Sequence, residues 1–285
     1  MSISEKTLTA AIVAALKANE AISDVYNQNF AVRYKSDGSP VTEADMQADK
    51  IILKHLKSTN IPVLSEERQI PPYAERKNYD YVWMVDPLDG TKEFTRKNGE
   101  FTVNIALIHQ QEPVFGIITA PALNVGYLGR KNHGAYKIRD INDWNKTPVA
   151  INYKNFLKES TPIPGGNAAP ESTVAISRSH FNPSDNELIR QLLNHKGEPS
   201  YISRGSSLKF CLLAEGKARF YIRTDKIHEW DTAAGHAILL AAGGAITTWP
   251  DKGRFIYNKE SLQNPGFVAC TNPGELELLK TKFSF

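Results

Sequence analysis

The feature that most constrains the fold is an apolar run that ends in two closely spaced aspartates. Residues 81–85 form a continuous apolar segment, which predicts a buried strand. Asp86 and Asp89 follow it, three residues apart, and Pro87 and Gly90 predict a turn from which a short helix begins. Free N–H groups at a helix start attract anions, and carboxylates beside them attract hard cations. The segment therefore predicts metal-assisted chemistry on a phosphate.

The first half of the chain predicts helices that cover an antiparallel sheet. Amphipathic spacing predicts helices over residues 1–29 and 43–57, the second capped by Thr42. Asp37-Gly38 predicts a hairpin turn between short strands. Further strands are expected over residues 61–64, 81–85, 101–109, 114–119 and 125–138.

The second half predicts a different architecture. Residues 161–172 are rich in Pro, Gly and Ala and are the best candidate for a domain boundary. Beyond them strands and helices alternate: strand 174–177, helix 183–193, a strand, helix 207–215, strand 218–222, helix 231–242 and strand 245–249. We therefore expect an α/β protein. Residues 1–160 would form an α+β metal-binding domain, and residues 161–285 an α/β substrate-binding domain.

Charge and cysteine usage exclude several classes of protein. With 34 basic and 31 acidic residues, the net charge of +3 is too balanced for a nucleic-acid-binding surface, although it allows a local basic pocket. No run approaches the ~18 apolar residues of a membrane span, and the first helix lacks the apolar core of a signal peptide. Cys211 and Cys270 match neither a disulfide framework nor a zinc site. We expect a cytoplasmic protein with no nucleic-acid partner and no integral membrane segment. Peripheral association with the inner membrane, and the choice between monomer and homodimer, stay open.

Acidic residues stand at four predicted element ends: Asp45, Glu66-Glu67, Asp86 with Asp89, and Asp231. Three of these have a structural alternative. Asp45 fits a capping box with Thr42, Glu66 fits a solvated loop, and Asp231 fits the N-cap of the apolar helix that follows. Asp86 and its neighbour resist such an explanation, because two crowded carboxylates repel each other unless a positive charge lies between them.

The same acidic positions lie in four segments: Ser39-Pro40-Val41-Thr42-x-Ala44-Asp45, Leu64-Ser65-Glu66-Glu67, Val85-Asp86-Pro87-Leu88-Asp89-Gly90-Thr91-x-x-Phe94 and Trp230-Asp231-x-Ala233-Ala234-Gly235. In this order they resemble the inositol monophosphatase superfamily of lithium-sensitive, magnesium-dependent phosphatases. The Asp-Pro-x-Asp-Gly-Thr motif is highly specific, whereas the other three are weak alone. The resemblance implies a layered α-β-α-β-α sandwich.

The resemblance also implies roles for individual residues. The cofactor would be Mg²⁺, held by Glu66, Asp86, the Leu88 carbonyl, Asp89 and Asp231, with Asp86 bridging two ions. Two such ions can clamp the attacking and leaving oxygens of an in-line displacement. Thr91 and Asp45 would be the catalytic pair that orients and deprotonates the attacking water. Backbone N–H groups of Gly90 and Thr91 would cradle the scissile phosphate.

Three further segments resemble one branch of that superfamily, the 3′(2′),5′-bisphosphate nucleotidases: Gly205-Ser206-Ser207-Leu208-Lys209-Phe210, Phe220-Tyr221-Ile222-Arg223 and Ser177-Arg178-Ser179-His180. Inositol-type members usually have a Glu near the position of Arg223. Lys209 and Arg223 would instead bind a second phosphate, with His180 near the nucleotide. A solvated surface charge is the alternative for each basic residue. The segment 224–229 departs from the Gly-Pro-Thr-type loop expected beside the base. The implied substrate-binding set is Glu66, Leu88, Asp89, Gly90, Thr91, His180, Ser206, Lys209, Arg223 and Asp231.

The expected function is hydrolysis of the 3′-phosphate of adenosine 3′,5′-bisphosphate, a by-product of sulfate activation, to AMP and phosphate. The partner is then a small nucleotide bisphosphate. The alternatives are an inositol- or sugar-phosphate phosphatase of the same superfamily and a nucleotide- or metal-sensing protein on the same fold. The haloacid-dehalogenase phosphatases are disfavoured, because their second Asp follows two residues after the first rather than three. The Asp-x-Glu pattern of exonucleases is missing.

Overall fold

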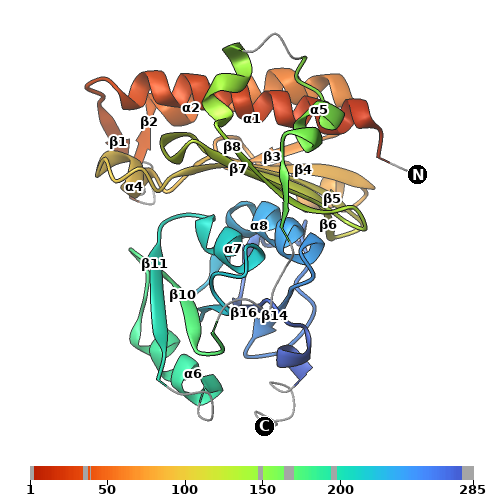
Figure 1. Ribbon diagram of the computed structural model, residues 1–285. Coiled ribbons are helices and arrows are strands. Elements are labelled where there is room, and N and C mark those ends of the chain that lie inside the picture. Colours follow the sequence, from red (N-terminus) through yellow and green to blue (C-terminus); the bar gives the residue numbers. More distant parts are fainter. Residues whose placement is uncertain are drawn as a thin grey trace.

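The structure, a computed structural model, describes residues 3–34, 38, 40–146, 150–163, 170–193 and 198–277. Helices and sheets alternate in five layers, helix–sheet–helix–sheet–helix (Figure 1). The expected α/β class and the α-β-α-β-α layering are therefore confirmed. No helix in the described ranges is long and apolar enough to cross a membrane.

The first sheet has seven strands in the order β3-β4-β5-β6-β7-β8-β9. Their bounds are β3 (Val63–Ser65), β4 (Tyr81–Asp89), β5 (Thr102–His109), β6 (Glu112–Ala120), β7 (Val125–Arg130), β8 (Gly134–Arg139) and β9 (Thr161–Ile163). Only β3 and β4 pair in parallel. Its outer face is covered by α1 (Glu5–Tyr26), α2 (Glu43–Leu56) and α5 (Tyr153–Lys158). The predicted single strand over residues 125–138 is two strands, because the chain turns at Asn132 and Gly134, both with positive φ.

The second sheet has five strands in the order β11-β10-β12-β16-β14. Their bounds are β10 (Thr173–Ser177), β11 (Ser200–Arg204), β12 (Phe220–Arg223), β14 (Ala245–Trp249) and β16 (Gly266–Cys270). Helix α6 (Pro183–Leu193) packs on one face, and α7 (Leu208–Ala214) and α8 (Glu229–Ala241) lie between the two sheets (Figure 1). Strand β16 was not predicted, and it is antiparallel to both β12 and β14.

Several short elements complete the described chain. These are β1 (Val32–Tyr34), β2 (Pro40–Thr42), α3 (Tyr73–Arg76), α4 (Thr91–Thr95), β13 (Ile227–His228), β15 (Gln263–Asn264) and the 3₁₀ helices η1 (Lys57–Thr59), η2 (Pro121–Leu123) and η3 (Ile141–Lys146). Strands β1 and β2 pair antiparallel, as predicted. Asp37 of the predicted hairpin turn and Ser39 of the first motif lie outside the described residues.

The predicted domain division at residues 160 and 161 stays a prediction. The first sheet is built from residues 63–163 and the second from residues 173–270. Residues 164–169 of the predicted boundary lie outside the described residues. Below, the chain up to residue 163 is called the first half, and the chain from residue 170 the second half.

Strand β4 is buried on both faces, which explains its continuous apolar sequence. Trp83 and Val85 belong to the core beneath α1 and α2, whereas Val82 and Met84 belong to the core that includes α7 and α8. Alternate residues of a strand share a face. Asp86 therefore follows Val82 and Met84 toward α8, which directs a carboxylate into the layer between the sheets.

The predicted turn between the two aspartates is instead a bulge. Strand β4 continues to Asp89, and its pairing with β5 shifts register between Asp86 and Asp89. Pro87 lies within the shift, and a proline cannot donate to the ladder. Gly90 then adopts a φ of 85°, and α4 begins at Thr91. Both carboxylates consequently stay attached to the sheet edge.

Two glycines let α8 lie directly on the first sheet. A Cβ on Gly116 would lie 2.5 Å from the Ala234 carbonyl oxygen, and one on Gly129 would lie 2.5 Å from Ile238 Cα. A side chain at either strand position would push the helix away from the sheet. This close packing brings Asp231, in the first turn of α8, toward the end of β4.

Candidate active site

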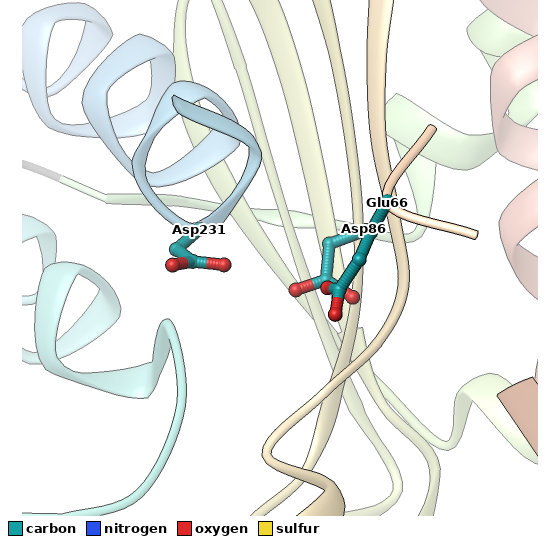
Figure 2. A group of neighbouring side chains, drawn as sticks. All are labelled: Glu66, Asp86 and Asp231. Carbon is teal, nitrogen blue, oxygen red and sulfur yellow. The ribbon is translucent and has the colours of Figure 1, made fainter. Parts of the chain in front are cut away.

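Three carboxylates from distant parts of the chain meet at the end of β4. Glu66 follows β3, which pairs in parallel with β4, so it lies beside Asp86. Asp231 reaches them from α8 across the layer between the sheets (Figure 2). Each residue offers a carboxylate oxygen within 4.8 Å of those of the other two. These are hard oxygen donors, the kind that bind Mg²⁺ and Ca²⁺.

Asp89 is held next to this cluster by two polar side chains. Ser207 Oγ donates to Asp89 Oδ2 at 2.8 Å, and Asn104 Nδ2 donates to the same oxygen at 3.2 Å. Sequence reasoning missed both partners as functional residues. Asn104 had a signal, because it is a polar residue in the middle of the buried strand β5, directly opposite Asp86. Ser207 stands next to a predicted site residue.

The electrostatics of the cluster fit a divalent cation. Burial first, then the charges of Glu66, Asp89 and Asp231, raise the pKa of Asp86 well above its usual value. Burial and the charges of Asp89 and Glu66 do the same to the pKa of Asp231. Such crowding is unfavourable for ionised carboxylates unless positive charge is supplied between them. The residues present therefore suit a hard metal ion.

Asp45 serves as a helix cap and also contacts the predicted catalytic threonine. Its Oδ2 accepts hydrogen bonds from the Thr42 backbone N–H at 2.7 Å and from Thr42 Oγ1 at 2.6 Å. Its Oδ1 accepts from Thr91 Oγ1 at 3.3 Å. Burial raises the pKa of Asp45 despite these hydrogen bonds. One carboxylate oxygen of Asp45 thus caps the helix, as the structural alternative proposed, and the other oxygen faces Thr91.

Basic side chains share with these carboxylates the lining of a cavity of ≈ 290 Å³. Lys209 on α7 is buried, and desolvation lowers its pKa to about 8. Arg223 ends β12, and its Nε is buried with no hydrogen-bond partner among the described residues. His180 follows β10, with Nε2 lying 3.2 Å from Lys92 Nζ. Burial, then Lys92 and Arg223, lower the pKa of His180.

One cavity thus contains nearly all residues that the sequence singled out. Its lining includes Glu66, Asp86, Leu88, Asp89, Gly90, Thr91, His180, Ser206, Lys209, Arg223 and Asp231. Asp45 is the exception and lies behind Thr91. The segment 224–229, flagged as a departure, contributes Lys226, Ile227 and His228 to the same lining. Helix α8 begins at Glu229, so Asp231 lies in its first turn rather than at the N-cap, and it accepts a hydrogen bond from the His228 N–H at 3.2 Å.

Comparison with known proteins identifies the family. Residues 4–283 match the inositol monophosphatase family. The chain belongs to this family. It is 42% identical over 257 residues to the 3′(2′),5′-bisphosphate nucleotidase CysQ of Salmonella typhimurium, covering 89% of this chain and 95% of the relative. It is 40% identical, with the same coverage, to the enzyme of that name from Escherichia coli.

Solved structures give the same result for the fold. The crystal structure of CysQ from Bacteroides thetaiotaomicron superimposes with a TM-score of 0.85 at 41% identity, covering 94% of this chain and 97% of the other. The extragenic suppressor protein suhB from Bartonella henselae gives a TM-score of 0.71 at 24% identity, with 98% of each chain covered. The second likeness supports the fold alone.

Proposed function

We propose that this chain is a magnesium-dependent 3′(2′),5′-bisphosphate nucleotidase that hydrolyses the 3′-phosphate of adenosine 3′,5′-bisphosphate. The products are AMP and phosphate. Relatives named for this activity are 40–42% identical over 89% of the chain. The proposal includes a cytoplasmic enzyme with a metal-binding region in residues 1–160 and a substrate-binding region in residues 161–285.

The observation that supports this substrate best is that one cavity contains both a group of carboxylates and a group of basic side chains. The lining includes Glu66, Asp86, Asp89 and Asp231, called the acidic side here, and Lys209, Arg223 and His180, called the basic side. It also includes Glu93, Lys92 and Lys226. A monophosphate carries only the phosphate that is hydrolysed. A bisphosphate also carries a second phosphate, which the basic side can bind. Arg223 has a buried Nε with no partner among the described residues, as expected for a donor that waits for an anion.

The metal ligands in this proposal are Glu66, Asp86, Asp89, Asp231 and the Leu88 carbonyl. When bound, Mg²⁺ supplies Lewis-acid stabilisation of the phosphoryl oxygens and of the attacking and leaving oxygens. Asp86 is crowded by the charges of Glu66, Asp89 and Asp231, so its carboxylate would help to hold the positive charge of the metal. The backbone N–H groups of Gly90 and Thr91 would contact the scissile phosphate.

Thr91 and Asp45 act on the attacking water. Thr91 donates its hydroxyl proton to Asp45 Oδ1, so the Thr91 oxygen is free to accept a proton from water. As the water oxygen forms a bond to phosphorus, the bond from phosphorus to the 3′-oxygen breaks on the opposite side, and the departing 3′-oxygen takes a proton from solvent to give the 3′-hydroxyl of AMP. The proton lost by water passes through Thr91 to Asp45, whose raised pKa suits a general base.

A phosphate-release panel tests the proposal. The substrates are adenosine 3′,5′-bisphosphate, inositol 1-phosphate and fructose 1,6-bisphosphate, each with Mg²⁺ and with a chelator. We expect the highest kcat/KM for the nucleotide, with AMP as its product and no turnover without metal. A preference for inositol or sugar phosphates would favour the other phosphatase class. Metal or nucleotide binding without any turnover would favour a sensing protein.

A further inference from the structure

The motif Ser177-Arg178-Ser179-His180 contains a residue that the proposed function does not use. The Arg178 guanidinium forks onto the Glu100 carboxylate, with Nε to Oε2 at 2.7 Å and Nη2 to Oε1 at 2.9 Å. Arg178 follows β10 of the second half, whereas Glu100 precedes β5 of the first half. The ion pair therefore joins the two halves. Neither residue lines the cavity.

Glu100 also holds a tight turn that precedes α7. The Gly205 N–H donates to Glu100 Oε2 at 2.8 Å, and Ser206 Oγ lies 2.7 Å from the Glu100 carbonyl oxygen. Gly205 packs so closely against Glu100 that no side chain fits at this position. A Cβ on Gly205 would lie 2.8 Å from the Glu100 carbonyl oxygen. Ser206 Oγ also lies 2.9 Å from the carbonyl oxygen of Asp89, a proposed metal ligand. The turn is thus fixed against the acidic side of the cavity.

The same turn fixes the buried cation of the basic side. Lys209 Nζ donates to the Ser206 carbonyl oxygen at 2.6 Å and lies 3.4 Å from the Arg204 carbonyl oxygen. Its side chain is only 4% exposed, so its ammonium has little freedom apart from the turn. Contacts therefore connect Arg178 through Glu100 and the turn at 204–206 to Lys209.

The segment after β10 also contacts the first half of the chain. Ser179 Oγ donates to Glu93 Oε1 at 2.6 Å, and His180 lies 3.2 Å from Lys92. Arg178 stands at the start of this segment. A shift of Arg178 would therefore change the position of His180 as well as that of Lys209.

We propose that the Glu100–Arg178 ion pair positions Lys209 and His180 for the second, non-scissile phosphate of the substrate. This inference rests on the proposed function, and it makes both members of the pair positioning residues for substrate specificity. The distance between two phosphates of one molecule is fixed by its covalent structure. The basic groups must consequently stand at a set distance from Asp89. The Glu100–Arg178 pair links the loops concerned, together with a longer contact of 3.6 Å between Arg204 Nη1 and Glu100 Oε1.

The first test compares substrates in variants of the pair. The Arg178 side chain is 41% exposed, so Arg178→Ala should fold. We expect kcat/KM for adenosine 3′,5′-bisphosphate to fall about tenfold, mainly through KM, since a small misplacement of a binding group has this order of effect. For adenosine 3′-monophosphate the change should stay below about twofold. Arg178→Lys should restore part of the loss, because it keeps the charge without the fork.

A control removes a more exposed, single-contact Arg–Glu ion pair elsewhere. Arg254 Nη2 lies 2.6 Å from Glu112 Oε1 and joins segments that are also distant in sequence. Arg254→Ala should leave both activities unchanged. Glu100→Gln should act in the same direction as Arg178→Ala, because it removes the charge of the ion pair while its amide oxygen can still accept from the Gly205 N–H.

Amide hydrogen exchange gives a readout that does not need activity. In the substrate-free protein, Arg178→Ala and Glu100→Gln should speed exchange in residues 203–209, and Arg254→Ala should not. Unchanged exchange would overturn the inference. Equal losses on both substrates, with a wild type that prefers the bisphosphate, would overturn it and leave the proposed function standing. A wild type with no such preference would overturn the proposed function, and the role assigned here with it.

Discussion

The two sides of the cavity are built in different ways. Glu66, Asp86 and Asp89 stand at the ends of two neighbouring strands of one sheet, where the register of β3 and β4 fixes their spacing. On the basic side Arg223 also ends a strand, β12, whereas Lys209 lies on α7 and depends on the turn at 204–206, and His180 lies in the loop after β10. Sheet ends hold groups rigidly, whereas loops vary more easily. The contrast suggests that the acidic side performs the hydrolysis of any phosphoester, and that the basic side selects the substrate.

The largest expected effect lies on the acidic side. Asp89→Asn keeps the shape of the side chain but removes the charge that helps to hold a metal ion. We expect kcat at saturating Mg²⁺ to fall about a thousandfold for bisphosphates and monophosphates alike, since several kcal/mol of charge stabilisation are lost. Steady-state kinetics measures this, with the exposed Asp251→Asn as control. Near-normal activity at saturating Mg²⁺ would remove Asp89 from the metal ligands.

The next effect separates the two oxygens of Asp45. Thr91→Ala and Asp45→Asn should each lower kcat about a hundredfold with KM little changed, and the double variant should cost little more. Thr42→Ala removes the hydroxyl that donates to the other oxygen and keeps the backbone N–H bond to it, so it should lower stability by about 1 kcal/mol and spare kcat. Kinetics and thermal unfolding measured together distinguish these outcomes. Additive losses from Thr91→Ala and Asp45→Asn would make Asp45 a helix cap alone.

A smaller and more selective effect is expected on the basic side. Arg223→Ala should lower kcat/KM for adenosine 3′,5′-bisphosphate about ten- to a hundredfold, because charged hydrogen bonds contribute about 1.5–3 kcal/mol. Activity on adenosine 3′-monophosphate should change much less. Arg223→Lys should restore part of the loss. The ratio of the two activities controls for folding damage. Equal losses would place the inositol- or sugar-phosphate assignment ahead.

The smallest effect concerns stability without metal. The pKa of Asp86 is raised in the folded state by burial and by Glu66, Asp89 and Asp231. A raised carboxyl pKa favours folding at low pH, and this contribution is lost as pH rises from the unfolded pKa through the folded one. The contribution of Asp86 to the stability of the metal-free protein should therefore fall as pH rises above about 4. At pH 7.5 without metal, the melting temperature of Asp86→Asn should be a few degrees above that of the wild type. Adding Mg²⁺ should raise the melting temperature of the wild type more than that of Asp86→Asn. Thermal scans that rank them the other way would contradict this.

Local signals explain why much of the first half could be predicted. The buried run into Asp86 and the capping residue Thr42 depend on neighbours in sequence, and the structure has the strand and the helix there. The bulge that continues β4 to Asp89 was not foreseen, because it arises from pairing with β5. The individual roles of the site residues stay predictions.

Long-range pairing explains what the sequence did not predict. Strand β16 has only five residues, and it becomes a central strand because β12 and β14 pair with it on either side. The contacts of Asn104 and Ser207 with Asp89 also join segments far apart in the chain. The early start of α8 at Glu229 depends on burial, since that carboxylate is fully enclosed and accepts hydrogen bonds from the Asn258 and Lys259 N–H groups.

The division of labour between the two sides is tested most directly by measuring binding in the absence of turnover. Calorimetric titration of Asp89→Asn with adenosine 3′,5′-bisphosphate in Mg²⁺ reports affinity while hydrolysis is blocked. We predict that adding Arg223→Ala to this background weakens binding about tenfold or more, and that binding of adenosine 3′-monophosphate changes little. Equal binding of the bisphosphate with and without Arg223 would contradict the account.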